Sequence, residues 1–269
     1  MKKCAHVINI GIQNTLVYRI NFVFRATFSL IPLMATIYLW RAVYAGKSAN
    51  DPTVAGYTLA SMTSYYLLVT IVDALTAVTE DDWQIASDIR EGAINQFLLK
   101  PIDYLTYRLC LFGSGRLIYV IFAALPVAIF IVIQRKFWVG PPDAITFCVF
   151  LVSLCLTALL QFFISYTMAL LAFWLLEIST LIFIVFAFEY MAGGHLFPLD
   201  ILPPSVSAAL QFTPFPYQLF FPVSVYLGRI SGPDLWQGLA IQVFWVAFFY
   251  VIARWTFRKG IRHYTAFGG

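Results

Sequence analysis

The sequence predicts an all-α integral membrane protein with six transmembrane helices, preceded by an N-terminal interfacial helix. Of its 269 residues, 61% are hydrophobic and only 11% are charged, whereas an ordinary soluble domain is about 45–50% apolar and about 25% charged. The mean hydropathy of +0.82 agrees with this excess. A chain of this length cannot hide so much apolar surface, because folding leaves about a quarter of the unfolded surface exposed. Lipid is the solvent that suits the apolar surface that remains exposed after folding.

The expected spans are mostly apolar stretches close to the about 20 residues that cross a hydrocarbon core of about 30 Å. They cover residues 22–40, 57–79, 113–133, 144–172, 178–197 and 235–253 of a single transmembrane domain, 22–257. The fourth and fifth need a separate argument, because residues 144–176 contain no charge over 33 positions. A helix that long would extend about 50 Å. We therefore expect two antiparallel helices with a turn within 170–179.

The distribution of basic residues predicts the topology. Lysines and arginines cluster near both ends of the chain, and the positive-inside rule places such clusters in the cytoplasm. Two cytoplasmic termini require an even number of crossings. Segment 80–108 and the tail 258–269 then lie inside, whereas 41–56, 134–143 and 198–234 lie outside. This bias, together with anionic lipid, explains the net charge of +4, so no nucleic-acid partner is expected.

Residues 1–21 carry an apolar stripe at helical spacing. Ile8, Ile12, Leu16 and Ile20 recur at every fourth position. This pattern is typical of a helix that lies in the membrane interface. A cytosolic helix packed on a partner is the alternative.

The outer segment 198–234 holds seven of the thirteen prolines of the chain. Proline removes a backbone donor, and backbone left without partners cannot face lipid. The segment therefore either caps the outer surface or dips back into the membrane against protein.

Four residues carry charge inside the expected spans. Such charges are costly in lipid and often functional. Arg25, Asp73 and Arg116 lie toward the cytoplasmic halves of their spans, so Asp73 is expected to pair with one of the two arginines. Snorkelling of the arginines and contact with a substrate are the alternatives. Glu189, in the fifth span, is a candidate for the transport pathway or for a hydrogen bond at a subunit seam.

The sequence offers no catalytic, metal or nucleotide site. The three histidines and four cysteines have no metal-ligand spacing. Gly46-Lys47-Ser48 resembles the end of a phosphate-binding loop, but Arg41 stands where that motif requires glycine. We expect no enzymatic activity, metal or cofactor in this chain.

Two further runs carry a family resemblance. One is Asp88-Ile89-Arg90-Glu91-Gly92 followed by Leu98-Leu99-Lys100-Pro101; the other runs from Gly193-Gly194 through Phe197-Pro198 to Pro203. Together they resemble the type-2 permeases of bacterial ATP-binding-cassette (ABC) transporters, over essentially the whole chain in length and span order.

The resemblance implies a permease of the bacterial inner membrane, with six spans and both termini cytoplasmic. Members pair as two permease subunits, identical or sister, and bind two cytosolic ATPase subunits that hold ATP and Mg; they mostly export. The coupling residues would be Asp88, Ile89, Arg90, Glu91 and Gly92, within segment 80–108. Segment 198–234 would form an outer lid. The pathway or gate candidates are Glu189, Gly193, Gly194, His195 and Phe197.

Three other interpretations stay open. An ion-coupled secondary transporter would need inverted repeats or paired broken helices, and the sequence shows neither. A lipid-acting membrane enzyme would need clustered ionisable residues, and the acidic run Glu80-Asp81-Asp82 includes no histidine. A structural assembly factor is the third. Neither the substrate nor the identity of the second permease subunit can be read from the sequence.

Overall fold

The computed structural model describes residues 2–47, 53–78 and 81–264. Ser48 and Glu80, and the side chains of Asp81 and Leu98, lie outside the described residues. Over the described part, the chain forms helices and no strand. These are α1 (Lys2–Leu16), α2 (Arg19–Ala45), α3 (Leu59–Thr76), α4 (Asp81–Arg90), α5 (Ile94–Leu98), α6 (Tyr104–Ile133), η1 (Arg135–Phe137), α7 (Ala144–Ala169), η2 (Leu170–Phe173), α8 (Ser179–Ala192), η3 (Leu199–Ile201), α9 (Pro204–Leu210), η4 (Phe215–Gln218), α10 (Phe220–Tyr226) and α11 (Pro233–His263).

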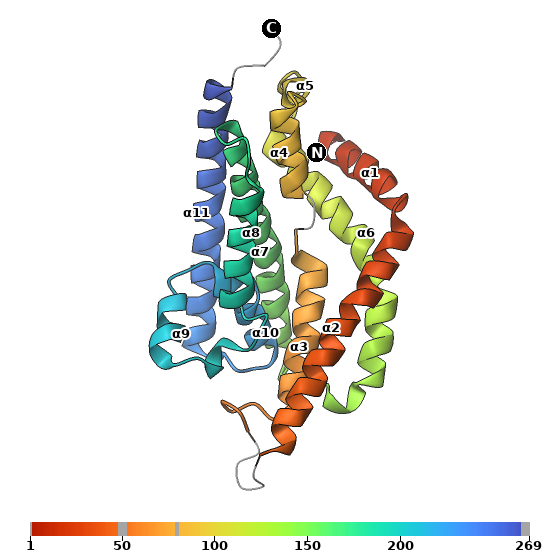
Figure 1. Cartoon of the computed structure of the whole chain (residues 1–269), viewed down its shortest axis with the longest axis vertical. Helices are drawn as coiled ribbons and strands as arrows, with labels where there is room; N and C mark the ends of the chain where they lie inside the picture. Colours follow the sequence, from red (N-terminus) through yellow and green to blue (C-terminus); the bar gives the residue numbers. More distant parts are fainter. Residues whose placement is uncertain (1, 48–52, 79–80, 265–269) are drawn as a thin grey trace.

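The chain runs back and forth along the long axis of the molecule (Figure 1). The start of α1, the end of α11, α4 and α5 lie toward one end, which we call the terminal end; the end of α2, the start of α3 and the α6–α7 connection lie at the opposite, loop end. Termini on the same side agree with an even number of passages. Within the described residues, five helices are long and apolar enough to cross a membrane: α2, α3, α6, α7 continued by η2, and α11.

The sixth apolar helix, α8, is shorter than predicted. Its 14 residues extend about 21 Å at a rise of about 1.5 Å per residue, which is less than a hydrocarbon core of about 30 Å. The predicted span 178–197 was therefore too long. The helix stops at Gly193 and Gly194, where Gly194 has a φ of +98° that residues with a side chain rarely adopt.

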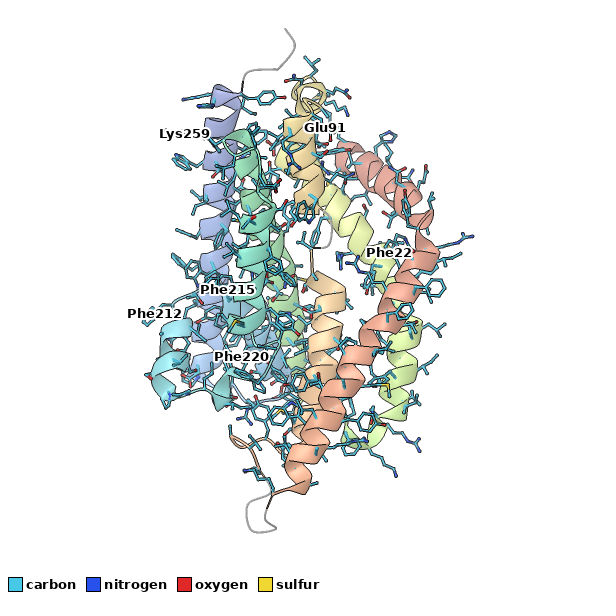
Figure 2. All side chains as sticks on the ribbon, viewed as in Figure 1. Phe22, Glu91, Phe212, Phe215, Phe220 and Lys259 are labelled. Atoms are coloured by element: carbon cyan, nitrogen blue, oxygen red, sulfur yellow. The ribbon has the colours of Figure 1, made fainter. Side chains whose placement is uncertain are left out.

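The chain completes this passage through the proline-rich segment. Its second half, η4 and α10, is buried, with Leu219, Val223 and Val225 fully inaccessible. α10 packs against α7 and α3. This half of segment 198–234 thus dips back against protein. α9 lies at the surface, and Phe212, just after it, points outward (Figure 2).

Polar side chains from neighbouring helices satisfy the re-entrant backbone. The Gln242 amide on α11 donates to the Tyr217 carbonyl at 2.9 Å and to the Ser153 carbonyl at 3.1 Å. The Thr157 hydroxyl on α7 donates to the same Tyr217 oxygen at 3.3 Å. Because lipid offers no hydrogen bonds, irregular backbone at this depth needs such partners.

The boundaries of α2, α6 and α11 shift outward from the predicted ones, whereas α3 is shorter than its predicted span 57–79. α6 begins at Tyr104 instead of residue 113, and its N-cap Asp103 accepts a hydrogen bond from the Thr106 amide at 3.2 Å. α11 continues to His263, so part of the predicted tail 258–269 is helical. The predicted spans follow the apolar residues, which indicate where the chain contacts lipid. A helix begins at its capping residue instead, so it can be longer than the apolar stretch within it.

α1 packs along α6 of its own chain. Gly11 lies against Ser114 and Leu111, whereas Ile8 of the predicted stripe is exposed and Ile12 and Leu16 are half-buried. The fourth member, Ile20, is exposed on α2, because α1 ends at Leu16 instead of continuing to residue 21. The exposed part of the stripe remains available to lipid, and the interfacial placement of α1 stays a prediction.

Replacing Gly11 with leucine should separate α1 from α6. Even a methyl group at Gly11 would overlap the Ser114 hydroxyl, and such overpacking costs about 1–3 kcal/mol. We expect a lower thermal unfolding midpoint in detergent and faster hydrogen exchange in α1. Gly113→Leu is the matched control, because open space surrounds that position. Equal midpoints for the two variants would contradict the packing described.

Candidate functional site

An acid and a histidine meet inside the bundle. Asp73, near the end of α3, and His195, just after α8, approach to 3.2 Å between Oδ1 and Nε2. The ring of Tyr190 stacks on the imidazole with 4.9 Å between centroids. We had expected Asp73 to pair with Arg25 or Arg116. Its carboxylate binds His195 instead, because the early end of α8 turns that residue inward.

Two tyrosines of α3 hold the turn that follows α8. The Tyr65 hydroxyl donates to the Gly194 carbonyl at 2.6 Å, and the Tyr66 hydroxyl donates to the Leu196 carbonyl at 2.6 Å. A Cβ atom at Gly194 would crowd the Tyr65 hydroxyl at 2.6 Å. The glycine therefore serves both the backbone conformation and this close approach. Gly193 and Gly194 are buried structural residues that aim His195.

The Asp73–His195 pair opens onto a cavity of about 450 Å³, which we call the central cavity. Its wall is mainly apolar and is built by residues of α2, α3, α4, α7 and α8. Arg25 and Glu189 both line it, so the structure brings these two candidates together with the pair. Asp82, on α4, also lines it, and burial raises the pKa of this carboxyl. Phe197, the remaining gate candidate, is half-buried and does not line the cavity.

A smaller cavity of about 290 Å³ lies on the other side of the pair. Arg25, Asp73 and His195 line it together with Arg116. The Arg116 guanidinium donates to the Ala74 carbonyl at 3.5 Å. The three predicted intramembrane charges therefore share one polar region, although the ion pair within it involves His195.

Predicted coupling residues on α4 face inward. Ile89 is only 2% exposed and packs, with Ile85 and Ala86, in a core shared with α7 and η2. Asp88 forms an ion pair with Arg108 of α6 and accepts a hydrogen bond from the Tyr104 hydroxyl at 2.7 Å. Asp88 and Ile89 thus fix α4 to the spanning helices, and the coupling role predicted for them stays a prediction.

The remaining coupling residues lie at the exposed tip. Arg90 and Glu91 are exposed, and Figure 2 shows Glu91 at the terminal end of the molecule. Gly92 follows with a φ of +80°, which turns the chain into α5. The Arg90 guanidinium donates to the Leu176 carbonyl at 3.2 Å, joining this tip to the α7–α8 turn. Leu99 and Leu176 are 89% and 88% exposed there.

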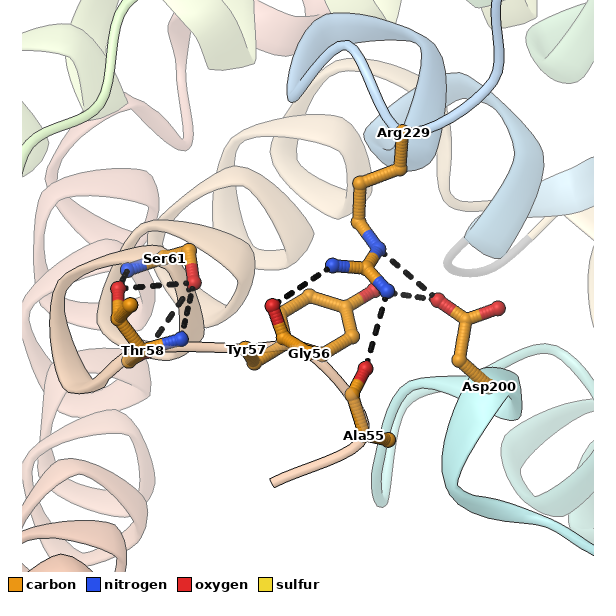
Figure 3. Close-up of polar contacts among 7 residues, drawn as sticks. All are labelled: Ala55, Gly56, Tyr57, Thr58, Ser61, Asp200 and Arg229. Carbon is orange, nitrogen blue, oxygen red and sulfur yellow. Dashed lines mark hydrogen bonds and ion pairs between the residues drawn. The ribbon is translucent and has the colours of Figure 1, made fainter. Parts of the chain in front are cut away.

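A second polar cluster at the loop end was not predicted (Figure 3). Arg229 donates to Asp200 at 3.0 Å and to the carbonyls of Ala55 and Gly56 at 3.1 and 3.3 Å. Its guanidinium lies over the Tyr57 ring, 3.7 Å from the centroid. The Tyr57 hydroxyl donates to Asp200 at 2.9 Å, and burial raises the pKa of this phenol, which keeps it a donor. We call this cluster the outer latch, since it ties the start of α3 to segment 198–234.

No group of histidine, cysteine, aspartate or glutamate side chains suited to a metal ion occurs among the described residues. One family model matches residues 30–268, and its description is ABC-2 family transporter protein. The match covers most of the chain and leaves out α1 and the beginning of α2. No curated protein matches the chain significantly.

Replacing Ile89 with alanine should destabilise the protein. Truncating a buried isoleucine costs about 2–5 kcal/mol, so the unfolding midpoint in detergent should fall clearly. Glu91→Ala, two residues away on the exposed tip, should change stability by about 0.5 kcal/mol or less. A variant Ile89→Ala as stable as the Glu91→Ala control would mean that α4 is not anchored as described.

Proposed function

We propose, on the premise that the chain belongs to the ABC-2 family of transporter proteins, that it is the permease subunit of an ATP-binding-cassette exporter. Two permease subunits, identical or sister, would form the pathway. Separate ATPase subunits would bind ATP and Mg at the terminal end. That end would face the cytoplasm of a bacterial cell, with the spans in the inner membrane.

The observation that carries this proposal is the attachment of α4 to the spanning helices α6 and α7. Its buried face is fixed to α7 by Ile85 and Ile89 and to α6 through the Asp88–Arg108 ion pair. Its end exposes Arg90 and Glu91 beside the apolar side chains of Leu99 and Leu176. A short helix rigidly joined to spans can transmit the movement of a docked ATPase, whereas a free loop cannot. The exposed charges would set docking specificity.

Pairing of two permeases is supported by the surface of α8. Ala192 is the one buried residue in this helix, and several large apolar side chains, such as Phe183 and Phe186, stay exposed. A second permease on this face would cover the helix and enclose the central cavity between the subunits.

Export is supported by the difference between the two ends of the molecule: the loop end is closed, and a cavity lies toward the terminal end. The outer latch and the buried α10 close the loop end. A further cavity of about 830 Å³, lined by residues of α1, α2, α4 and α6, lies toward the terminal end and shares Arg25 with the central cavity. Substrate would therefore enter from the cytoplasmic side and leave when the latch opens.

Co-purification tests the proposal directly. The tagged chain, extracted in mild detergent, should bring down an ABC-type ATPase in equal ratio. Arg90→Ala combined with Glu91→Ala should lower ATPase recovery about tenfold, because these charges are at the docking tip. Lys259→Ala is the control, since Lys259 lies toward the same end on α11 (Figure 2).

Other outcomes would discriminate against the proposal. A chain without ATPase, whose transport in vesicles follows an imposed ion gradient, would favour the secondary transporter. Equal losses for the double variant and for Lys259→Ala would show that docking lies elsewhere on the terminal end.

A further inference from the structure

The charges around the central cavity do not balance. Three carboxylates line it, Asp73, Asp82 and Glu189, against the Arg25 guanidinium and the His195 imidazole. His195 is engaged with Asp73. Arg25 is at the boundary that the central cavity shares with the other two cavities.

Of these three carboxylates, Asp73 binds His195 and Asp82 accepts a hydrogen bond from the Trp83 amide at 2.9 Å, whereas Glu189 has no such partner. No residue that the structure describes forms a hydrogen bond or an ion pair with its side chain, and the charges that act on it are those of His195 and Asp73. A carboxylate surrounded by apolar side chains is costly unless a cation or a proton compensates it.

Two polar side chains of α7 in the wall of this cavity lack a hydrogen-bond partner among the described residues. Gln161 is only 6% exposed, and its Oε1 atom accepts no hydrogen bond; the Ser165 hydroxyl one turn later is likewise unsatisfied. Both residues line the central cavity. Buried polar atoms normally have partners, so α7 contributes polar groups to a wall that is otherwise mainly apolar.

The rest of the wall is aromatic and aliphatic. Trp83, Phe183, Phe186 and Tyr190 line the cavity, in which apolar surface predominates. Aromatic faces attract cations, most strongly where water is excluded. The wall therefore suits a cation that carries apolar groups better than it suits a small hydrated ion.

We propose that the central cavity binds a lipophilic organic cation, with Glu189 as its counter-ion. This names the substrate class of the proposed function and rests on it. The carboxylate supplies the charge selectivity, and the aromatic wall supplies the apolar contact.

Tetraphenylphosphonium and tetraphenylborate test the proposal, because they have nearly the same shape and opposite charge. The purified full-length chain in detergent micelles is equilibrated with each radiolabelled probe, and saturable binding is measured by dialysis. We expect the phosphonium to bind and the borate to bind at least tenfold more weakly. Glu189→Gln should weaken phosphonium binding about 10- to 100-fold, as loss of a charged partner does.

Two variants make the result decisive. Glu189→Asp keeps the charge and should retain most of the binding, which a merely structural role would not predict. Asp234→Asn removes an exposed carboxylate at the start of α11 and should leave binding unchanged. Monodisperse elution and unchanged helix content verify that each variant folds. Equal binding of both probes, or phosphonium binding untouched by Glu189→Gln, would overturn the proposal.

The assay needs no ATPase, so its failure is separable from failure of the proposed function. If the chain co-purifies with an ATPase but does not distinguish the two probes, the proposed permease function is supported and the proposed cation site is contradicted. If the chain binds the phosphonium through Glu189 but co-purifies with no ATPase, the cation site is supported and the ATPase-coupled function is contradicted.

Discussion

The structure depends on how the backbone that follows α8 is satisfied. α8 ends after 14 residues, so the chain must cover the remaining depth without a continuous helix, where lipid supplies no hydrogen bonds. The spanning helices provide the partners. Tyr65 and Tyr66 bind the carbonyls just after α8, and Gln242 binds the Tyr217 carbonyl before α10. Without these donors, a proline-rich segment would be too costly at this depth.

The same arrangement connects the central cavity with the loop end through α3 and the residue before it. The Tyr57 ring packs edge-on against Tyr65 at 6.1 Å, and Tyr65 packs against Tyr66 at 5.4 Å. Tyr57 belongs to the outer latch, whereas Tyr65 holds the turn that aims His195. A rearrangement of the latch that displaces Tyr57 is therefore transmitted through packed rings to the wall of the cavity. Packed aromatic contacts of this kind transmit displacement because the interior has little free volume.

Composition alone predicted the membrane class and most of the helices, since lipid demands long apolar stretches. It could not predict the length of α8, because apolar residues continue past Gly193 and Gly194 into a buried loop. The Asp73–His195 and Asp200–Arg229 pairs join residues far apart in sequence, and no local pattern indicates them. Ile85 and Ile89 lie one helical turn apart in the sequence, but this apolar pair does not say what covers it. Here α7 and η2 cover it, and a docked partner does not.

The anchoring contacts are distributed unevenly among the helices. At the terminal end, α4, α6, α7 and α11 form one unit: Asp88 binds Arg108, Arg254 binds Asp103 at 2.6 Å, and Tyr104 stacks on Phe257 at 5.7 Å. At the loop end, α3, α7 and α10 share a second core. α8 belongs fully to neither, since it buries Ala192 alone. Force applied to α4 reaches α6 and α7 directly. Within one subunit, the wall of the central cavity with the fewest buried residues is then α8, the helix that carries Glu189.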